Sequence, residues 1–259
     1  MTEPHTSAAD LLSDPVALAA QVASLNEAEP QRILEWAISV FGSRLSLAAS
    51  FGVEDVALIA MSAGLNVVER PSIFFLDTGR IHQETYETIE RIRSRYGVAV
   101  QAFSPEASTL EPFVAANGWH SFYTSKVARE ACCSVRKLAP LARALRGQSA
   151  WITGLRQEQA GARRNVAVVE ADHSNGLIKV NPLARWTTAQ VWDFVRAEGV
   201  PYNPLHDRGF ASIGCAPCTR AISPGEDLRA GRWWWEDGVG GECGLHAARS
   251  KPNSSEVGI

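Results

Sequence analysis

The feature that most restricts the fold of this chain is an alternation of apolar runs with amphipathic segments up to about residue 156. The apolar runs have the length and the bounding residues of buried strands, and the segments between them have helical periodicity. Strands are expected at 44–52, 71–79, 98–103 and 149–156, and helices at 32–42, 53–63, 82–97 and about 124–146. The alternation predicts an α/β fold with a parallel sheet and helices on both faces, because parallel strands need a crossover between them.

The region after residue 156 has a different pattern. Asn175-Gly176 separates two β-prone runs, which is typical of a hairpin. Thr187 and Thr188 are suited to cap a helix over 189–199. From about residue 201 the composition shifts toward Pro, Gly, Trp and charged residues, and the periodicity is lost.

Charge and composition exclude several classes of protein. A net charge of −3 gives no reason to expect a nucleic acid or a membrane as partner. The chain contains no run of the roughly 20 apolar residues that a membrane span needs, and its acidic N-terminus does not resemble a signal peptide. We therefore expect a cytoplasmic protein. The sequence does not decide its oligomeric state, and a homo-oligomer is possible. In a reducing compartment its five cysteines indicate metal ligands or redox groups rather than disulfides.

Residues suited to bind an anion follow the first two expected strands. Ser50 and Gly52 lie in a turn before a helix, where N–H groups, a hydroxyl and the helix dipole meet. The turn is neither a Walker A loop nor a GxGxxG motif, and most turns of this kind are only turns. Asp77, Thr78 and Gly79 follow the second strand, where an aspartate that caps the next helix is an equal alternative to a ligand contact.

Arginines follow a further strand at 149–156. Arg156, Arg163 and Arg164 are suited to a bidentate grip on phosphate or sulfate, although surface arginines are common. Because ligands of open α/β sheets bind outside the carboxyl ends of the strands, the three strand ends together favour an anionic nucleotide. Contacts to it are predicted for Ser50, Gly52, Asp77, Thr78, Gly79, Gly154 and Arg156.

Four of the five cysteines form two pairs. Cys132 and Cys133 are adjacent, and Cys215 and Cys218 form a Cys-x-x-Cys. Two pairs suit a four-thiolate site for zinc or for an iron–sulfur cluster. Adjacent cysteines diverge by about 100° on a helix, which suits the separate corners of a cluster better than one small ion. The alternative is a set of buried apolar cysteines with no metal.

The motifs ACCSVRK, GCAPCTR, GRWWWE and GECGLH follow SFGVED and LDTGR in this order. In this combination the chain resembles the assimilatory adenylyl-sulfate reductase family over about residues 40–246. The resemblance implies a Rossmann-like adenine nucleotide α-hydrolase fold and a [4Fe–4S] cluster on Cys132, Cys133, Cys215 and Cys218. It implies reduction of adenosine 5′-phosphosulfate to sulfite and AMP, in sulfate assimilation and cysteine biosynthesis. Cluster-free relatives that act on 3′-phosphoadenosine 5′-phosphosulfate lack these four cysteines, which favours the substrate without the 3′-phosphate.

The resemblance also assigns a role to the fifth cysteine. Cys243 is the expected nucleophile, whose thiolate takes the sulfur group from the nucleotide to form an S-sulfocysteine. A thiol of thioredoxin, or of a glutaredoxin-like donor, then releases sulfite. Because the attacked sulfur carries anionic oxygens, we expect the positive charges of Lys137, Arg229 and Arg232 beside it. His246 is a further candidate, as a group that sets the pKa of the Cys243 thiol.

The chain is expected to divide into an N-terminal extension (1–30), a nucleotide-binding and iron–sulfur domain (31–225) and a C-terminal segment with the catalytic cysteine (226–259). Three alternatives remain at this point. One is a reductase of 3′-phosphoadenosine 5′-phosphosulfate, and another is a four-cysteine zinc protein that senses a nucleotide. The third is an ATP pyrophosphatase, although SFGVED lacks the second Gly and the final Ser of that motif. The Trp run at 233–235 is interpreted as packing rather than as a stacking surface for a base.

Overall fold

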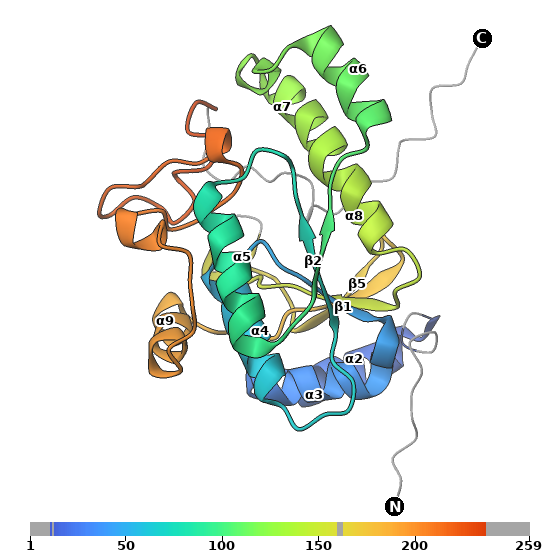
Figure 1. Cartoon of the computed structure of the whole chain (residues 1–259). Coiled ribbons are helices and arrows are strands. Elements are labelled where there is room, and N and C mark those ends of the chain that lie inside the picture. The colour runs from blue at the N-terminus through green and yellow to red at the C-terminus, as the bar shows by residue number, and fades with distance from the viewer. Residues whose placement is uncertain (1–10, 12, 160–162, 237–259) are drawn as a thin grey trace, which may run out of the picture.

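The structure, a computed structural model, describes residues 11, 13–159 and 163–236. Within this part of the chain, six strands form one sheet in the order β3-β2-β1-β4-β6-β5 (Figure 1). The strands are β1 (Leu45–Ala48), β2 (Ser72–Leu76), β3 (Val100–Phe103), β4 (Ala150–Ile152), β5 (Val169–Asp172) and β6 (Leu177–Val180). The α-helices are α2 (Pro15–Leu25), α3 (Pro30–Phe41), α4 (Val53–Gly64), α5 (Gln83–Tyr96), α6 (Ala107–Asn117), α7 (Lys126–Cys133), α8 (Ala139–Ala144) and α9 (Thr188–Ala197).

The sheet is parallel except at one edge. β1 pairs in parallel with β2 and β4, β2 with β3, and β4 with β6, whereas β5 runs antiparallel to β6. The predicted hairpin is confirmed, but its turn is longer than the Asn-Gly pair alone, because Asp172 faces Leu177 across the strands. The Asp172 carboxylate accepts hydrogen bonds from the backbone N–H groups of Ser174 and Asn175, which hold this turn closed.

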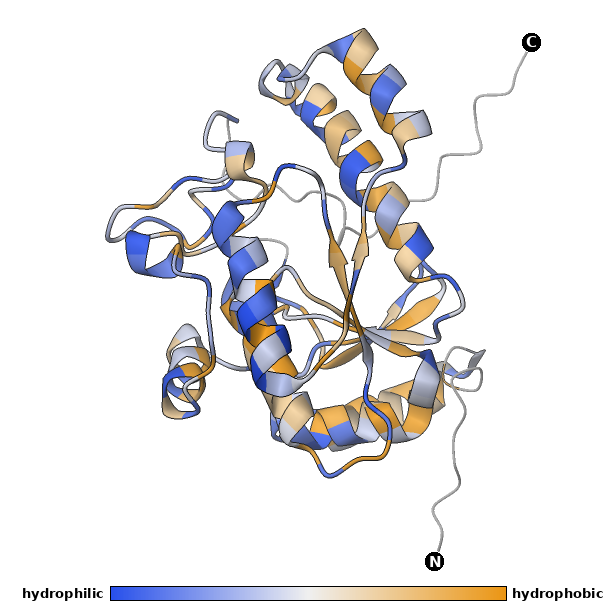
Figure 2. Ribbon diagram, viewed as in Figure 1, coloured by the Kyte–Doolittle hydropathy of each residue, from blue (hydrophilic) through white to orange (hydrophobic). Residues whose placement is uncertain are grey.

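Helices cover both faces of the sheet, as the alternation predicted. The main core lies on the face covered by α3, α4, α5 and α9, and includes Leu34, Val56, Ile92 and Val191. A smaller core on the other face joins Leu141 of α8 to side chains of the strands. Figure 2 shows the strands as mostly hydrophobic and α5 as mostly hydrophilic, which is expected for buried strands beside a surface helix.

The predicted helix ends are confirmed where the local chemistry is clear. α5 ends at Gly97, whose φ of 65° is the left-handed conformation that glycine adopts without strain. Thr187 caps α9: its side chain accepts a hydrogen bond from the backbone N–H of Gln190, and the Gln190 side chain bonds back to the cap. After residue 201 the described chain contains only short 3₁₀ turns.

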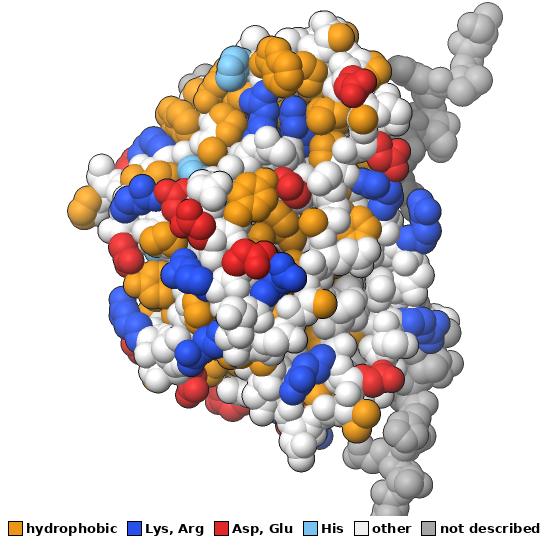
Figure 3. Space-filling view, in the orientation of Figure 1, with side chains coloured by type: hydrophobic (Ala, Val, Ile, Leu, Met, Phe, Trp, Pro, Cys, Tyr) orange, Lys and Arg blue, Asp and Glu red, His pale blue; other side chains and the backbone are white. Residues whose placement is uncertain are grey.

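Part of the expected N-terminal extension belongs to the main core. Leu25 of α2 and Leu11 are both buried there. No helix in the described part of the chain is long and apolar enough to cross a membrane. Figure 3 shows hydrophobic side chains gathered at the top of the molecule, where α6 and α7 lie. Exposed apolar side chains in this part of the sequence include Trp119 and Val127.

Candidate active site

A large cavity opens at the carboxyl ends of β1, β2 and β4, where the sequence predicted a nucleotide. It encloses about 1410 Å³ of empty space, open solvent at its mouth included. Its wall includes Ser50, Gly52, Thr78, Gly154, Arg156, Lys137, Arg229 and Arg232. The fold therefore brings together residues that lie as far apart as positions 50 and 232. Asp77 and Gly79 are not part of this wall, as far as the described residues define it.

The turn between β1 and α4 is held closed by a carboxylate of its own helix. The backbone N–H and the hydroxyl of Ser50 both donate to Asp55 Oδ2, at 2.6 and 2.7 Å. Burial raises the pKa of Asp55 to about 6, although the hydrogen bonds from Ser50 act against this shift. Phe51 has a φ of 61°, which is rare for a residue other than glycine, and its ring is fully buried. Asp55 thus accepts both of the hydrogen bonds that were expected for an external anion, while Ser50 and Gly52 both lie on the cavity wall.

The turn after β2 is shaped by its aspartate. Asp77 Oδ1 accepts hydrogen bonds from the Gly79 N–H and from the Tyr86 hydroxyl, both at 2.9 Å. Asp77 therefore orders the turn through these two hydrogen bonds. It does not cap the next helix, as the sequence also allowed, because the N-cap of α5 is His82 and no side chain caps that helix. Thr78 is buried, and its hydroxyl lies 3.2 Å from the sulfur of Cys215. This turn connects the cavity to the cysteines.

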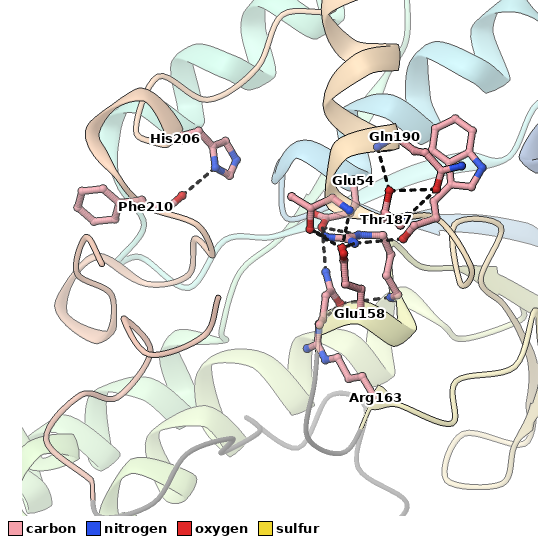
Figure 4. A network of polar contacts seen from close by, with 11 residues as sticks. Glu54, Glu158, Arg163, Thr187, Gln190, His206 and Phe210 are labelled. Carbon is pink, nitrogen blue, oxygen red and sulfur yellow. Dashed lines mark hydrogen bonds and ion pairs between the residues drawn. The ribbon is translucent and has the colours of Figure 1, made fainter. Parts of the chain in front are cut away.

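Arg156, predicted to grip the anion, is bound to the protein itself, through the side chains of Glu54 and Glu158 that are labelled in Figure 4. Its guanidinium pairs with Glu54 at 2.9 Å and with Glu158 at 2.8 Å, and it also donates to the Thr188 hydroxyl at 3.0 Å. Only 2% of its surface is exposed. The sequence could not show this, because Glu54 lies about a hundred positions away. In this arrangement Arg156 connects the loop after β4 to α4 and α9. Arg163 joins the same network, because it donates a hydrogen bond to Gln159, which in turn donates one to Glu54.

Gly154 lies on the cavity wall, and the first turn of α4 packs closely against it. A Cβ atom there would come within 2.7 Å of Asp55 Oδ1 and 2.8 Å of Glu54 Cβ. These distances are shorter than van der Waals contacts, so any larger residue would push the end of β4 away from α4. The role of Gly154 in the structure is this close approach.

The four paired cysteines meet at a second, smaller cavity. Cys132, Cys133, Cys215 and Cys218 all line it, together with aromatic and basic side chains. Three of them are buried, and Cys132 is partly exposed. Within the described residues, no three His, Cys, Asp or Glu side chains are placed as ligands of one metal ion.

The helix that carries Cys132 and Cys133 changes its winding directly after them. Ser134–Leu138 form a π-helix between α7 and α8, a rare feature that often marks functional sites. Arg136 and Lys137 are buried in this widened turn. Arg136 donates to the Thr78 carbonyl at 2.7 Å, and Lys137 lines both cavities.

The basic side chains around the cysteines affect their thiols unequally. Burial raises the pKa of Cys218 to about 12, and the neighbouring Cys215 adds to this effect. Burial would also raise the pKa of Cys215, but the charges of Lys137 and Arg232 and the Thr78 hydroxyl together lower it below the ordinary value. The cysteine cavity is therefore a place where negative charge on sulfur is stabilised by positive side chains.

Arg229 and Arg232 reach the nucleotide-sized cavity from the loop before the Trp run. Their guanidinium carbons lie 5.9 and 4.9 Å from the centre of the Trp233 ring. Trp233 is buried against the cysteines, and Trp235 packs on Tyr123 with ring centres 4.5 Å apart. The packing interpretation of the Trp run is confirmed for these two rings.

The described chain ends beside the cysteines. Glu236 forms a bidentate ion pair with Arg129 of α7, at 2.6 and 3.0 Å, and Arg129 is fully buried. This pair fixes the point from which the C-terminal segment starts. Cys243 and His246, the predicted nucleophile and its histidine, lie outside the described residues.

Some residues of the cavity were missed by the sequence reading. His206, Gln159 and Asp55 all lie on its wall. Asp55 could have been noticed as an acidic residue in the first turn of α4, where it meets the helix dipole. His206 follows no strand and belongs to no recognised motif, so only the fold places it there.

Comparison with known proteins decides the family. A model of the phosphoadenosine phosphosulfate reductase domain matches residues 44–221, which include the three strand ends and all four paired cysteines. The chain belongs to this reductase domain family. It is 51% identical over 205 residues to the adenosine 5′-phosphosulfate reductase of Allochromatium vinosum, covering 79% of each chain. It is 45% identical over 242 residues to the enzyme of the same name from Pseudomonas aeruginosa, covering 91% of this chain and 89% of that one.

A solved structure agrees with this family assignment. The phosphoadenylyl-sulfate reductase of Candida auris, in a phosphate complex, aligns with a TM-score of 0.65 and 28% identity over 78% of this chain and 96% of that one. The FMN adenylyltransferase of Candida glabrata aligns with a TM-score of 0.51 at 15% identity, which shows a shared fold alone. The reductase domain family therefore has relatives named for either of two nucleotides, with and without a 3′-phosphate.

Proposed function

We propose that this protein is an adenosine 5′-phosphosulfate reductase that uses thioredoxin, or a glutaredoxin-like donor, to release sulfite and AMP in sulfate assimilation and cysteine biosynthesis. The observation that carries the proposal is the pair of adjoining cavities, one nucleotide-sized and one lined by four cysteines, with Lys137 on the wall of both. The curated relatives at 45–51% identity carry the same name. The reaction needs free thiols, so we place the protein in the cytoplasm, where thiols stay reduced.

The four cysteines support a [4Fe–4S] cluster as the resident cofactor. They line one cavity with apolar walls from Phe122 and Trp233. A cluster held by four thiolates is anionic, and the buried charges of Arg129, Arg136 and Lys137 around the cavity fit that charge. When bound, the cluster would cross-link α7 to the loop of Cys215 and supply fixed charge beside the nucleotide.

The chemistry of the proposed reaction uses the protein's own side chains. The phosphosulfate group lies among Lys137, Arg229 and Arg232, whose charges offset the repulsion between its oxygens and an approaching thiolate. The Cys243 thiolate attacks the sulfur, the bond from sulfur to the phosphate oxygen breaks, and AMP leaves with the electron pair. His246 acts on the pKa of the Cys243 thiol in this proposal.

The second half of the cycle belongs to the thiol donor. A donor thiolate attacks Cys243 and expels sulfite, and the second donor thiol then resolves the mixed disulfide. The donor is oxidised to its disulfide, Cys243 returns as a thiolate, and the two electrons balance the reduction of the sulfur group. The anchored start of the C-terminal segment at Glu236 supports this reading, because Cys243 is seven residues further along the chain.

Arg232→Ala is expected to cost about 2–4 kcal/mol of transition-state stabilisation, the loss of one strong charge-assisted contact in an enclosed site. Steady-state kinetics should be measured with adenosine 5′-phosphosulfate and with its 3′-phosphorylated form. The surface substitution Arg70→Ala, at a mostly exposed side chain far from the cavity wall, serves as the control. A preference of the natural enzyme for the 3′-phosphorylated nucleotide by more than about tenfold, which is ~1.4 kcal/mol, would contradict the proposed substrate.

Gly214→Ala is expected to act through Arg232. A Cβ at Gly214 would come within 2.6 Å of the Arg232 guanidinium carbon, and a long side chain can move away at little cost in stability. We expect nearly unchanged thermal stability and a fall in kcat/KM of about tenfold or more. Gly64→Ala, where nothing lies within 4 Å of the new Cβ, is the matched control.

The double variant separates this mechanism from simple damage. If Gly214 only makes room for the Arg232 guanidinium, adding Gly214→Ala to Arg232→Ala should change kcat/KM little further. Full additivity of the two effects would show that Gly214 acts independently of Arg232.

A further inference from the structure

His206 is a cavity residue that the proposed chemistry does not use. It begins a short 3₁₀ turn, and its ring lies against Trp192 of α9 with ring centres 5.3 Å apart. The side chain forms part of the wall of the large cavity. Among the described residues, His206 lines the large cavity and not the cysteine cavity, so it belongs to the nucleotide side of the site.

The hydrogen bonds of His206 determine which ring nitrogen carries the proton. Nδ1 lies 2.8 Å from the carbonyl oxygen of Phe210 (Figure 4). Because a carbonyl only accepts, Nδ1 must donate, and in the neutral ring Nε2 is then a bare acceptor. Burial lowers the pKa of His206, although the charge of Glu54 acts in the opposite direction, so the neutral ring is favoured.

Nε2 has no hydrogen-bond partner among the described residues, although the atom is buried. A buried acceptor without a partner costs stability, and such groups are rare in folded proteins. In Figure 4 this nitrogen points away from Phe210. A ligand that brings a donor to it would remove the cost.

The walls of the cavity indicate which donor of a nucleotide reaches this nitrogen. Phe74, Leu141 and Trp151 belong to the smaller core on the α8 face and make one side of the cavity apolar, as suits a purine ring. His206 packs instead against α9, on the opposite face, and shares its part of the wall with the polar Glu54. A sugar hydroxyl, which both donates and accepts, fits this polar side better than the base does.

We propose that His206 Nε2 accepts a hydrogen bond from a ribose hydroxyl of the bound adenosine nucleotide and makes the site selective for an unmodified hydroxyl at that position. This inference rests on the proposed function, which supplies the adenosine nucleotide as the class of ligand. A phosphate in place of the hydroxyl has no proton to offer at neutral pH beyond a partial one, and would set oxygen against nitrogen. His206 thus recognises the ribose through a hydrogen bond and takes no part in the transfer of the sulfur group.

Two substitutions distinguish the roles of the two ring nitrogens. His206→Asn keeps an amide N–H near the position of Nδ1, so the hydrogen bond to Phe210 can remain while Nε2 is lost. His206→Gln instead puts an amide oxygen near the position of Nε2 and gives up the Phe210 bond. The Asn variant therefore tests whether the acceptor at Nε2 is needed for binding of the nucleotide. The Gln variant tests whether an acceptor at the same place restores that binding.

The experiment measures binding, so that it does not depend on turnover. Isothermal titration calorimetry on the anaerobically purified full-length protein compares AMP, 2′-deoxy-AMP and 3′-deoxy-AMP. For the natural protein, one of the deoxy nucleotides should bind roughly fivefold to tenfold more weakly than AMP, the value of one hydrogen bond. His206→Asn should bind AMP more weakly by a similar factor and should no longer distinguish that deoxy nucleotide from AMP, whereas His206→Gln should distinguish it again. If the hydroxyl is the 3′ one, adenosine 3′,5′-bisphosphate should also gain affinity relative to AMP in the Asn variant.

Two results would overturn the inference. One is an Asn variant that loses the same factor for all three nucleotides, which would make His206 a structural residue of its loop. The other is an Asn variant that binds all of them like the natural protein. Failure of the proposed function gives a different result, because the natural protein would then bind none of the adenosine nucleotides. Thermal melting of each variant shows whether the fold is intact.

Discussion

Cys243→Ser is expected to abolish sulfite release, with turnover falling by at least about a thousandfold, because a serine hydroxyl is not ionised at neutral pH and is a poor nucleophile toward sulfur. The variant should still bind nucleotide, since the described residues of the cavity wall, Lys137, Arg229 and Arg232 among them, are unchanged. It should also keep its iron, because the four proposed ligands Cys132, Cys133, Cys215 and Cys218 are unchanged. Sulfite production with reduced thioredoxin, together with AMP binding and iron content, measures all three expectations.

The natural enzyme gives the complementary result when no thiol is present. Mixing it with adenosine 5′-phosphosulfate should release one AMP per site and add one SO₃ group, a gain of ~80 Da, to the nucleophilic cysteine. Peptide mapping should place the adduct on the GECGLH segment, and reduced thioredoxin should remove it as sulfite. A serine variant that still cleaves the nucleotide, or an adduct on another residue, would show that Cys243 is not the nucleophile.

Loss of one of the paired cysteines should have an equally large effect. Cys133→Ser and Cys218→Ser are each expected to lose the iron, the acid-labile sulfide and nearly all activity. The two cysteines come from α7 and from the loop of Cys215, which lie about eighty residues apart in sequence, so a missing ligand opens the link between them. Without a cluster the buried thiol of Cys218 also has a raised pKa, because burial disfavours its thiolate.

Iron and sulfide counting after anaerobic purification tests the cluster directly. Cys243→Ser is the control, because it removes a cysteine from the chain and leaves the four proposed ligands unchanged. Full iron and normal turnover in either cluster variant would contradict the ligand assignment. About one zinc per chain with no labile sulfide would instead support the zinc-sensor alternative.

Much of the fold could be predicted from local patterns. The alternation of strand and helix has only a few solutions in a parallel sheet, because crossovers are right-handed and strands of this length must be buried on both faces. Gly97 and the Thr187 cap were read correctly because each acts within one turn of its own helix. The edge position of β5 was not predicted, since the order of strands depends on contacts between distant segments.

The sequence by itself also determined the pairing of the cysteines into one site. The two cysteines of each pair, Cys132-Cys133 and Cys215-x-x-Cys218, are close together because of their spacing in the sequence. The structure brings both pairs to one cavity. The spacing alone left zinc, a cluster and buried apolar cysteines as alternatives, and the cluster came from the resemblance.

Only the tertiary structure decided what the charged residues of the strand ends do. Arg156, Asp77 and Ser50 look like nucleotide contacts in sequence, yet their hydrogen bonds go to Glu54, to Tyr86 and Gly79, and to Asp55. The physical reason is that a buried polar group must find a partner, and its identity depends on which distant segment packs against it. The same reason applies in reverse to His206, whose unpaired nitrogen becomes visible only when every described neighbour has been placed.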